Sequence, residues 1–187
     1  MSPLKHKILQ VASDLFQTRG INATGVDTIV AVAGTTKMTL YKHFTSKELL
    51  ILEVLKKCHQ DFQSWLNDRL SRHDRKPAEK LQKLFDAIEE WINSPAYQGM
   101  AFLKASAEFP EESSAIHRLS AEQSEAFRDY LAALAREAGV KDHKGLALQL
   151  SLLIEGAMHA EHIRRGSGGI RHAKKAARIL IDNALKA

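Results

Sequence analysis

A short stretch near the N-terminus gathers side chains that suit contact with a nucleic acid. Hydroxyls, ammonium groups, an imidazole and a phenol stand at positions that a short helix would leave exposed on one face. Such groups bond to phosphate oxygens and to the edges of bases. The residues concerned are Thr35, Thr36, Lys37, Met38, Tyr41, Lys42 and His43. A helix of about two turns is not stable alone, so neighbouring elements must hold these residues in place.

The surrounding segment, VDTIVAVAGTTKMTLYKHF at residues 26–44, predicts that support. It is typical of two short helices joined by a turn at Gly34, because glycine adopts a left-handed backbone without strain. Apolar positions at helical spacing predict a small core under the second helix. The core residues are Leu15, Phe16, Ile29, Ala33, Leu40 and Phe44. Two helices in this order indicate a helix-turn-helix motif, whose second helix enters the major groove of DNA. An ordinary helical hairpin is the alternative.

The distribution of charge agrees with a polyanionic partner. The chain of 187 residues has a net charge of +5, and residues 1–57 hold eight Lys and Arg against four Asp and Glu. Most of the excess positive charge therefore lies near the N-terminus, as expected of a DNA-binding protein. Cys58 is the only cysteine, which excludes an intrachain disulfide and fits a reducing cytosol. No apolar run approaches the ~20 residues that span a membrane, so we expect a cytoplasmic protein without a membrane partner.

The pattern along the chain predicts an all-α fold with nine helices. Apolar residues recur at helical spacing, Gly and Pro separate the segments, and no segment alternates as a strand would. Two capping pairs are expected at helix starts, Thr24 with Asp27 and Thr45 with Glu48. The expected helices are 3–19, 26–33, 37–43, 46–70, 77–92, 99–109, 112–138, 142–165 and 170–186.

Residues 8–52 resemble the N-terminal domain of TetR-type transcriptional regulators. The positions that carry the resemblance are Ile8, Ala12, Leu15, Phe16, Gly20, Thr24, Val26, Ile29, Ala33, Gly34, Thr36, Lys37, Thr39, Leu40, Tyr41, His43, Phe44, Ser46, Lys47, Glu48 and Leu49. The resemblance implies a nine-helix architecture with a DNA-binding domain at 1–47 and an effector-binding and dimerisation domain at 48–187. It also implies a homodimer built on the last two helices and, in most members, a repressor that a small molecule releases from a palindromic double-stranded DNA operator.

The resemblance assigns roles to single residues. Positions that contact phosphates are matched by Thr24, Tyr41 and Lys47, and positions at or near base edges by Thr35, Thr36, Lys37, Met38, Lys42 and His43. Three residues depart from the family pattern. Gly25 stands where Ser or Thr is usual, which is expected to remove one phosphate contact. Val30 stands where Ala is usual, and Met38 replaces a small residue on the recognition helix, where it can touch a thymine methyl group.

The C-terminal part offers no motif whose ligand residues carry over. Its surplus of aromatic and Met side chains indicates a small apolar or aromatic effector, bound in a cavity between helices. The candidate effector residues are Trp65, Phe85, Met100, Phe102, Phe127, Glu155, Met158, His159 and His162. A regulator without a small-molecule ligand, controlled by a protein partner, is the alternative.

Glu155, His159 and His162 share one face of the helix expected at 142–165. A carboxylate and two imidazoles can bind zinc or iron, or they can form a polar patch on a pocket wall or a dimer face. Because no fourth ligand is identifiable, no metal or other cofactor is assigned. The sequence has no phosphate-binding glycine loop and no nucleophile elbow, so an enzyme is not expected. The same helix is apolar on more than one side, which predicts burial against a partner subunit.

Overall fold

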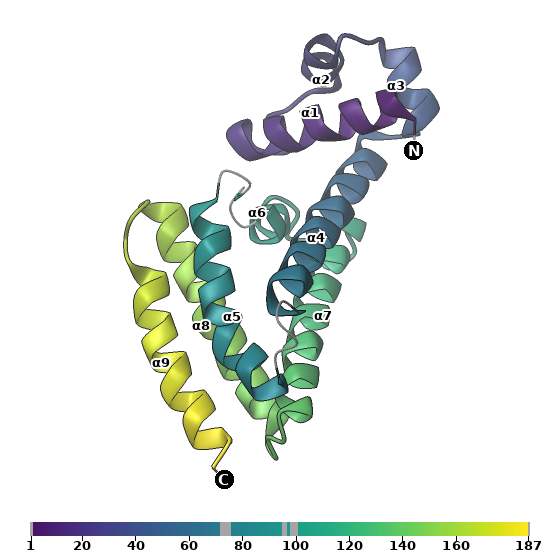
Figure 1. Ribbon diagram of the computed structural model, residues 1–187. Helices are drawn as coiled ribbons and strands as arrows, with labels where there is room; N and C mark the ends of the chain where they lie inside the picture. The colour runs from purple at the N-terminus through teal and green to yellow at the C-terminus, as the bar shows by residue number, and fades with distance from the viewer. Residues whose placement is uncertain (1, 72–75, 95–96, 98–100, 187) are drawn as a thin grey trace. The chain divides into compact units, whose positions relative to one another are not determined.

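The computed structural model describes residues 2–71, 76–94, 97 and 101–186 (Figure 1). Within these ranges all regular structure is helical and no strand is present. The helices are α1 (Pro3–Arg19), α2 (Val26–Ala33), α3 (Lys37–His43), α4 (Lys47–Ser71), α5 (Pro77–Asn93), α6 (Ala101–Glu108), α7 (Ala115–Glu137), α8 (His143–Ile163) and α9 (Gly169–Ala184). The all-α fold and the nine helices predicted from the sequence are confirmed in the described part of the chain.

The helices form two compact units, each with its own buried core. The N-terminal unit comprises Met1–Asp61 and Ala101–Glu122, and therefore contains α1, α2, α3, most of α4, α6 and the start of α7. The C-terminal unit comprises Phe62–Met100 and Gln123–Ala187. These units describe packing alone. The functional division into residues 1–47 and 48–187 stays a prediction, because packing does not show which residues bind DNA or an effector.

The core of the N-terminal unit holds the two short helices α2 and α3. Ile29, Ala33 and Leu40 are 0 % exposed. The remaining predicted members of this core are buried in the same cluster, namely Leu15, Phe16 and Phe44. Each large apolar side chain contributes roughly 1.5–3 kcal/mol when buried. The predicted core is therefore confirmed, and it stabilises helices of eight and seven residues that are too short to persist alone.

The turn that joins α2 and α3 has the geometry that the sequence predicts. Gly34 has a φ of +66°, in the left-handed region, where a side chain would introduce strain. Thr36 caps α3, since its hydroxyl accepts the N–H of Thr39 at 3.2 Å. The N–H of Thr35 donates to the Val30 carbonyl at 2.9 Å. These local bonds fix the direction in which α3 leaves the turn.

Both of the expected capping pairs are wrong by one residue. Gly25 rather than Thr24 stands at the start of α2, because the Thr24 hydroxyl turns inward and donates to the Gly20 carbonyl at 2.7 Å. At the start of α4, Ser46 rather than Thr45 accepts the N–H of Leu49, at 3.0 Å. Several capping residues in a row compete for one helix start, and the register of the following helix selects among them.

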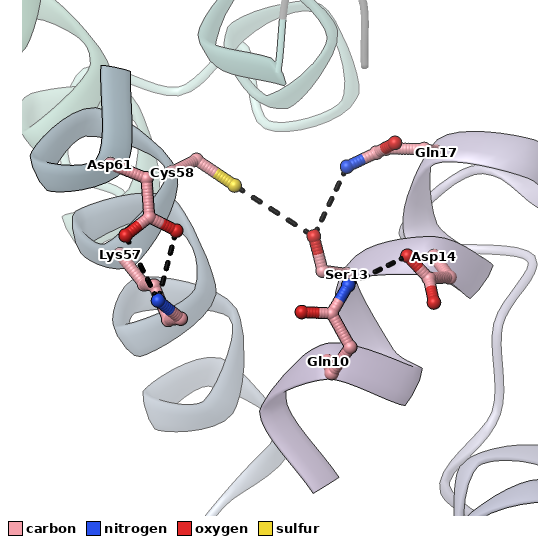
Figure 2. A network of polar contacts seen from close by, with 7 residues as sticks. All are labelled: Gln10, Ser13, Asp14, Gln17, Lys57, Cys58 and Asp61. Atoms are coloured by element: carbon pink, nitrogen blue, oxygen red, sulfur yellow. Dashed lines mark hydrogen bonds and ion pairs between the residues drawn. The ribbon is translucent and has the colours of Figure 1, made fainter. Parts of the chain in front are cut away.

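Polar contacts link α1 with α4 inside the N-terminal unit, as Figure 2 shows. The side-chain amide of Gln17 donates to Ser13 Oγ at 3.1 Å, and Ser13 Oγ lies 3.8 Å from Cys58 Sγ. One turn along α4 from Lys57, the Asp61 carboxylate pairs with the Lys57 ammonium at 2.9 Å. Burial raises the pKa of the Cys58 thiol. The thiol is therefore protonated at neutral pH and packs as a small, weakly polar side chain.

In the C-terminal unit, α9 packs against both α8 and α5. The core is apolar, and its fully buried members include Leu81, Leu84, Phe85, Ile88, Ile92, Leu131, Ala135 and Leu150. At the surface, the Lys174 ammonium of α9 lies 2.5 Å from an Asp86 oxygen and 3.1 Å from a Glu89 oxygen, both on α5. The unit therefore presents α8 and α9 as a packed helix pair, and α5 supports α9.

Candidate nucleic-acid interface

The second helix of the motif, α3, has one buried face and one accessible face. Leu40 is 0 % exposed, whereas Met38 is 67 % and Tyr41 44 % exposed. Among the other residues predicted to contact DNA from α3 and its cap, Thr36, Lys37 and Lys42 are exposed, and Thr35 and His43 are half-buried. The accessible groups are those that bond to phosphates and base edges, and Leu40 anchors the helix that carries them.

Val30, which departs from the family pattern of Ala, is accommodated without disturbing the motif. Its side chain is buried in the same cluster as Ile29 and Leu40. Its carbonyl still accepts the N–H of Thr35 across the turn. The additional methyl groups therefore become part of the core, and α2 and α3 keep their contact.

An ion pair joins the two helices of the motif. Lys37 Nζ lies 2.8 Å from Asp27 Oδ1, and both side chains are more than half exposed. The hydrogen bond with Asp27 raises the pKa of Lys37, so the ammonium stays charged at neutral pH. Exposed ion pairs contribute little stability, and Lys37 can therefore exchange Asp27 for a DNA acceptor at small cost. The sequence indicates Asp27 only as a capping residue, since its pairing depends on how the turn folds.

Two residues with expected phosphate contacts are engaged within the N-terminal unit. Thr24 is 0 % exposed, and its hydroxyl is used by the turn between α1 and α2. Its side chain therefore lies outside the accessible surface. Lys47 is half-buried, and its ammonium donates to the Ile21 carbonyl at 2.8 Å. Burial lowers the pKa of Lys47. Because an ammonium has three donors, this bond leaves Lys47 able to contact a phosphate as well.

The aromatic residues expected at an effector site are divided between the cores of the two units. Phe102 packs against the core of the N-terminal unit, with its ring 6.0 Å from that of His59. Phe85 is buried in the core of the C-terminal unit, against which Trp65, Phe127 and Met158 also pack. Met100 lies outside the described residues. Aromatic side chains bury large areas and fill cores, so packing accounts for these residues and the effector site stays a prediction.

The polar members of the expected effector site lie along α8. Glu155 is half-buried, and His159 and His162 are exposed. Among the residues that the structure describes, no three His, Cys, Asp or Glu side chains are placed to hold a metal ion. These three residues form a polar strip on one helix.

The same described part contains no helix long and apolar enough to cross a membrane.

An α2 with one face in the core and an α3 with a polar, accessible face, joined by a glycine turn, define a helix-turn-helix DNA-binding protein. Comparison with known proteins identifies the family of this domain. Residues 8–54 match the family model of bacterial regulatory proteins of the tetR family. The chain resembles the crystal structure of SCO4454, a TetR-family transcriptional regulator from Streptomyces coelicolor, with a TM-score of 0.90 and 25% identity over 97% of this chain and 96% of the other. Residues 8–54 therefore carry the DNA-binding domain of TetR-family transcriptional regulators, which are not enzymes, and the likeness of fold to such a regulator extends over the whole chain.

Two relatives show how the similarity is distributed. The regulator YjdC of Escherichia coli (strain K12) is 22% identical over 177 residues, which cover 95% of this chain and 93% of YjdC. The transcriptional repressor KstR2 of Mycolicibacterium smegmatis is 40% identical over 91 residues, which cover 47% of this chain and 42% of KstR2. The first likeness extends over the whole chain at low identity. The second has higher identity but covers less than half of either protein.

Proposed function

We propose that the protein is a cytoplasmic homodimeric repressor that binds a near-palindromic operator through α3 and is released by a small apolar or aromatic effector. The observation that carries the DNA-binding part is the two-sided character of α3, in which buried Leu40 opposes exposed Met38 and Tyr41. The repressor role is supported by the likeness to KstR2, which is a repressor. In a two-fold dimer, the α3 helices of the two protomers meet successive major grooves about 34–36 Å apart.

Selection of duplexes from a randomised DNA pool tests this function directly. The full chain is expected to enrich two inverted half-sites separated by about one helical turn. Footprinting on the selected duplex is then expected to protect both half-sites. A pool without enrichment, or a footprint confined to one half-site, would contradict the proposal.

Exposed apolar residues on α8 and α9 support the dimer. Leu148, Leu152 and Ile163 share one side of α8, and Leu152 is 59 % exposed. On α9, Ile179 is 63 % exposed. Exposed apolar side chains on a packed helix pair indicate a protein partner, and a second copy of the same helix pair is self-complementary under two-fold symmetry.

Replacing Leu152 or Ile179 with Glu is expected to dissociate the dimer, because a carboxylate would be buried without a partner in the interface. Light scattering at micromolar concentration should give twice 20.9 kDa for the unmodified protein and 20.9 kDa for either variant. Leu103→Glu, which changes an exposed apolar residue of α6, serves as the control and should leave the dimer intact. Leu153 and Leu180 are unsuitable positions because both pack against the core of their own unit. A monomeric mass for the unmodified chain would refute the dimer.

Two lysines are expected to differ in what they contribute to operator binding. Lys37→Ala should relax the preference at one base position and cost about 1–3 kcal/mol there. Lys47→Ala should weaken binding to all duplexes and lower the salt dependence by about one counterion, since it removes a phosphate contact. Binding of both variants to a library of operator variants at several salt concentrations measures the two effects. Identical profiles would show that the division into base-reading and phosphate-binding residues is wrong.

Release by an effector competes with control by a protein partner that needs no ligand. Met158 favours a ligand, because it packs with aromatic side chains against the core of the C-terminal unit, a lining typical of an apolar pocket. Calorimetric titration of aromatic and lipophilic compounds, with and without operator, distinguishes the two. An effector should bind more weakly to the operator complex, by the same factor by which it weakens operator binding. If no compound shows this coupling, the protein-partner alternative is favoured.

A further inference from the structure

Helix α6 contacts the end of α1 through two charged side chains one turn apart. Lys104 Nζ donates to the Gln17 carbonyl at 3.2 Å, in the last turn of α1. Glu108 accepts the N–H of Ile21 at 2.9 Å and the N–H of Asn22 at 2.6 Å. The Lys104 ammonium therefore lies at the negative end of the α1 dipole, and the Glu108 carboxylate accepts from backbone N–H groups that follow the helix. All of these residues lie within the N-terminal unit.

The turn after α1 is shaped to receive a carboxylate. Gly20 has a φ of +91°, and a Cβ at this position would lie 3.4 Å from Glu108 Oε1. The N–H groups of Ile21 and Asn22 converge on the Glu108 carboxylate, as successive backbone N–H groups in a turn do at anion-binding sites. The Asn22 side-chain amide also donates to the Glu108 carbonyl, at 3.2 Å. Three donors from two adjacent residues therefore bind the end of α6.

The peptide groups at Ile21 are held from two sides by opposite charges. The Ile21 N–H donates to the Glu108 carboxylate, and the Ile21 carbonyl accepts from the Lys47 ammonium at 2.8 Å. The Ile21 side chain is buried in the core of the unit. This residue begins the turn that leads into α2, so α6 and the start of α4 together fix the point from which the helix-turn-helix motif departs.

Apolar packing also holds α6, since Ala105 is 0 % exposed in the core of the unit. A cavity of about 20 Å³, room for about one water molecule, lies beside these contacts. It is lined by Ser13, Phe16, Gln17, Ile21, Ile51, Val54, Leu55, Cys58, Ala101 and Lys104. Lys104 therefore lies both at this cavity and at the end of α1.

We propose that Glu108 and Lys104 are positioning residues for DNA binding. They hold the turn at residues 20–22 and thereby fix the orientation of α2 and α3 relative to α1. Neither residue touches DNA in this proposal, and both lie outside residues 8–54. The inference rests on the proposed function, since it assumes that α3 enters the groove. It implies that the DNA-binding part is incomplete without α6, a helix about eighty residues further along the chain.

Glu108→Gln in the full chain tests the proposal, with Glu112→Gln as the control because Glu112 is an exposed carboxylate nearby. Both changes remove one negative charge, which by electrostatics alone should strengthen binding to DNA. Glu108→Gln is instead expected to weaken binding to the selected operator about tenfold and to leave binding to an unrelated duplex at the control level. Amide hydrogen exchange of Ile21 and Asn22 should accelerate about tenfold or more in this variant only, as expected when charged hydrogen bonds are lost.

A second pair of variants separates charge from position. Lys104→Met is expected to lose operator affinity, and Lys104→Arg should restore it, because the guanidinium can still donate to the Gln17 carbonyl. Unchanged exchange at Ile21 and Asn22 in Glu108→Gln would show that the contact does not exist in solution. Faster amide hydrogen exchange with unchanged operator affinity would show that the contact stabilises the turn but does not affect DNA binding. Either result overturns the positioning role, whereas failure of the unmodified chain to select any duplex would refute the proposed function instead.

Discussion

Shortening Leu40 to Ala is expected to lower the free energy of unfolding of the N-terminal unit by about 2–5 kcal/mol, the usual cost of a leucine-sized cavity in a core. Leu40 is the buried residue of α3 and is 0 % exposed. With its anchor shortened, α3 should lose its fixed orientation, and operator binding should fall with stability. Urea unfolding followed by circular dichroism, together with operator titration, measures both effects on the full chain.

Met38→Ala is the matched control on the same helix. It removes a side chain of similar size from a position that is 67 % exposed, so the free energy of unfolding should change by less than about 0.5 kcal/mol. Operator preference should nevertheless change, because the thioether no longer meets a thymine methyl group. Equal losses of stability in the two variants would contradict the assignment of one buried and one accessible face to α3.

The parts of the fold that follow from short-range patterns could be predicted. Apolar spacing gives the helices to within a few residues, because the buried face of a helix repeats every three to four positions. Gly34 and Thr36 mark the turn of the motif, since each acts on its immediate backbone. The core around Leu40 follows for the same reason: its members lie on faces that the period alone identifies.

Exact helix starts could not be predicted where several capping residues adjoin. Thr24 and Thr45 are good caps by residue type, yet Gly25 and Ser46 occupy the positions. In the first case the Thr24 hydroxyl completes the turn after α1, a tertiary requirement that no local pattern contains. The same burial removes Thr24 from the surface at which the family resemblance expects a phosphate contact.

The contacts of α6 and the proposed effector residues depend on distant parts of the chain. Glu108 binds Ile21 and Asn22, which lie 87 and 86 residues earlier. Lys104 and Glu108 are four residues apart, a spacing that fits an ordinary solvent-exposed pair on a helix equally well. Phe102 likewise packs with the N-terminal unit. Composition can indicate that aromatic residues are numerous, but it does not show which of them share a core.

Glu161 near the end of α8 shows how a buried carboxylate can determine a turn. It is 4 % exposed, and its oxygens accept the N–H of Gly166 at 2.8 Å, the N–H of Gly168 at 2.9 Å and the Ser167 hydroxyl at 2.7 Å. Both glycines have positive φ. The turn between α8 and α9 therefore folds around this carboxylate, which fixes the helix pair whose open side carries the proposed dimer interface.

Glu161→Gln is expected to lower the free energy of unfolding of the C-terminal unit by about 1–3 kcal/mol, the order expected when partly buried donors lose a charged acceptor. The glutamine amide keeps the size of the side chain but turns an N–H₂ group toward groups that are themselves donors. Glu155→Gln, the same change on the same helix, is the control and should cost less than about 0.5 kcal/mol. Urea unfolding at neutral pH measures both, and equal losses would show that Glu161 does not stabilise the turn.

The same carboxylate should make the stability depend on pH in a defined direction. Hydrogen bonds, first that from the Ser167 hydroxyl, lower the pKa of Glu161 below its ordinary value of 4.5. A carboxyl with a lowered pKa in the folded state contributes its full stability above the unfolded value and loses it as the pH falls through the folded value. The difference in unfolding free energy between the unmodified protein and Glu161→Gln should thus be constant from pH 7 to about 5 and shrink below pH 4.5. A difference that stays constant down to pH 3 would contradict the ionised state of Glu161 in the turn.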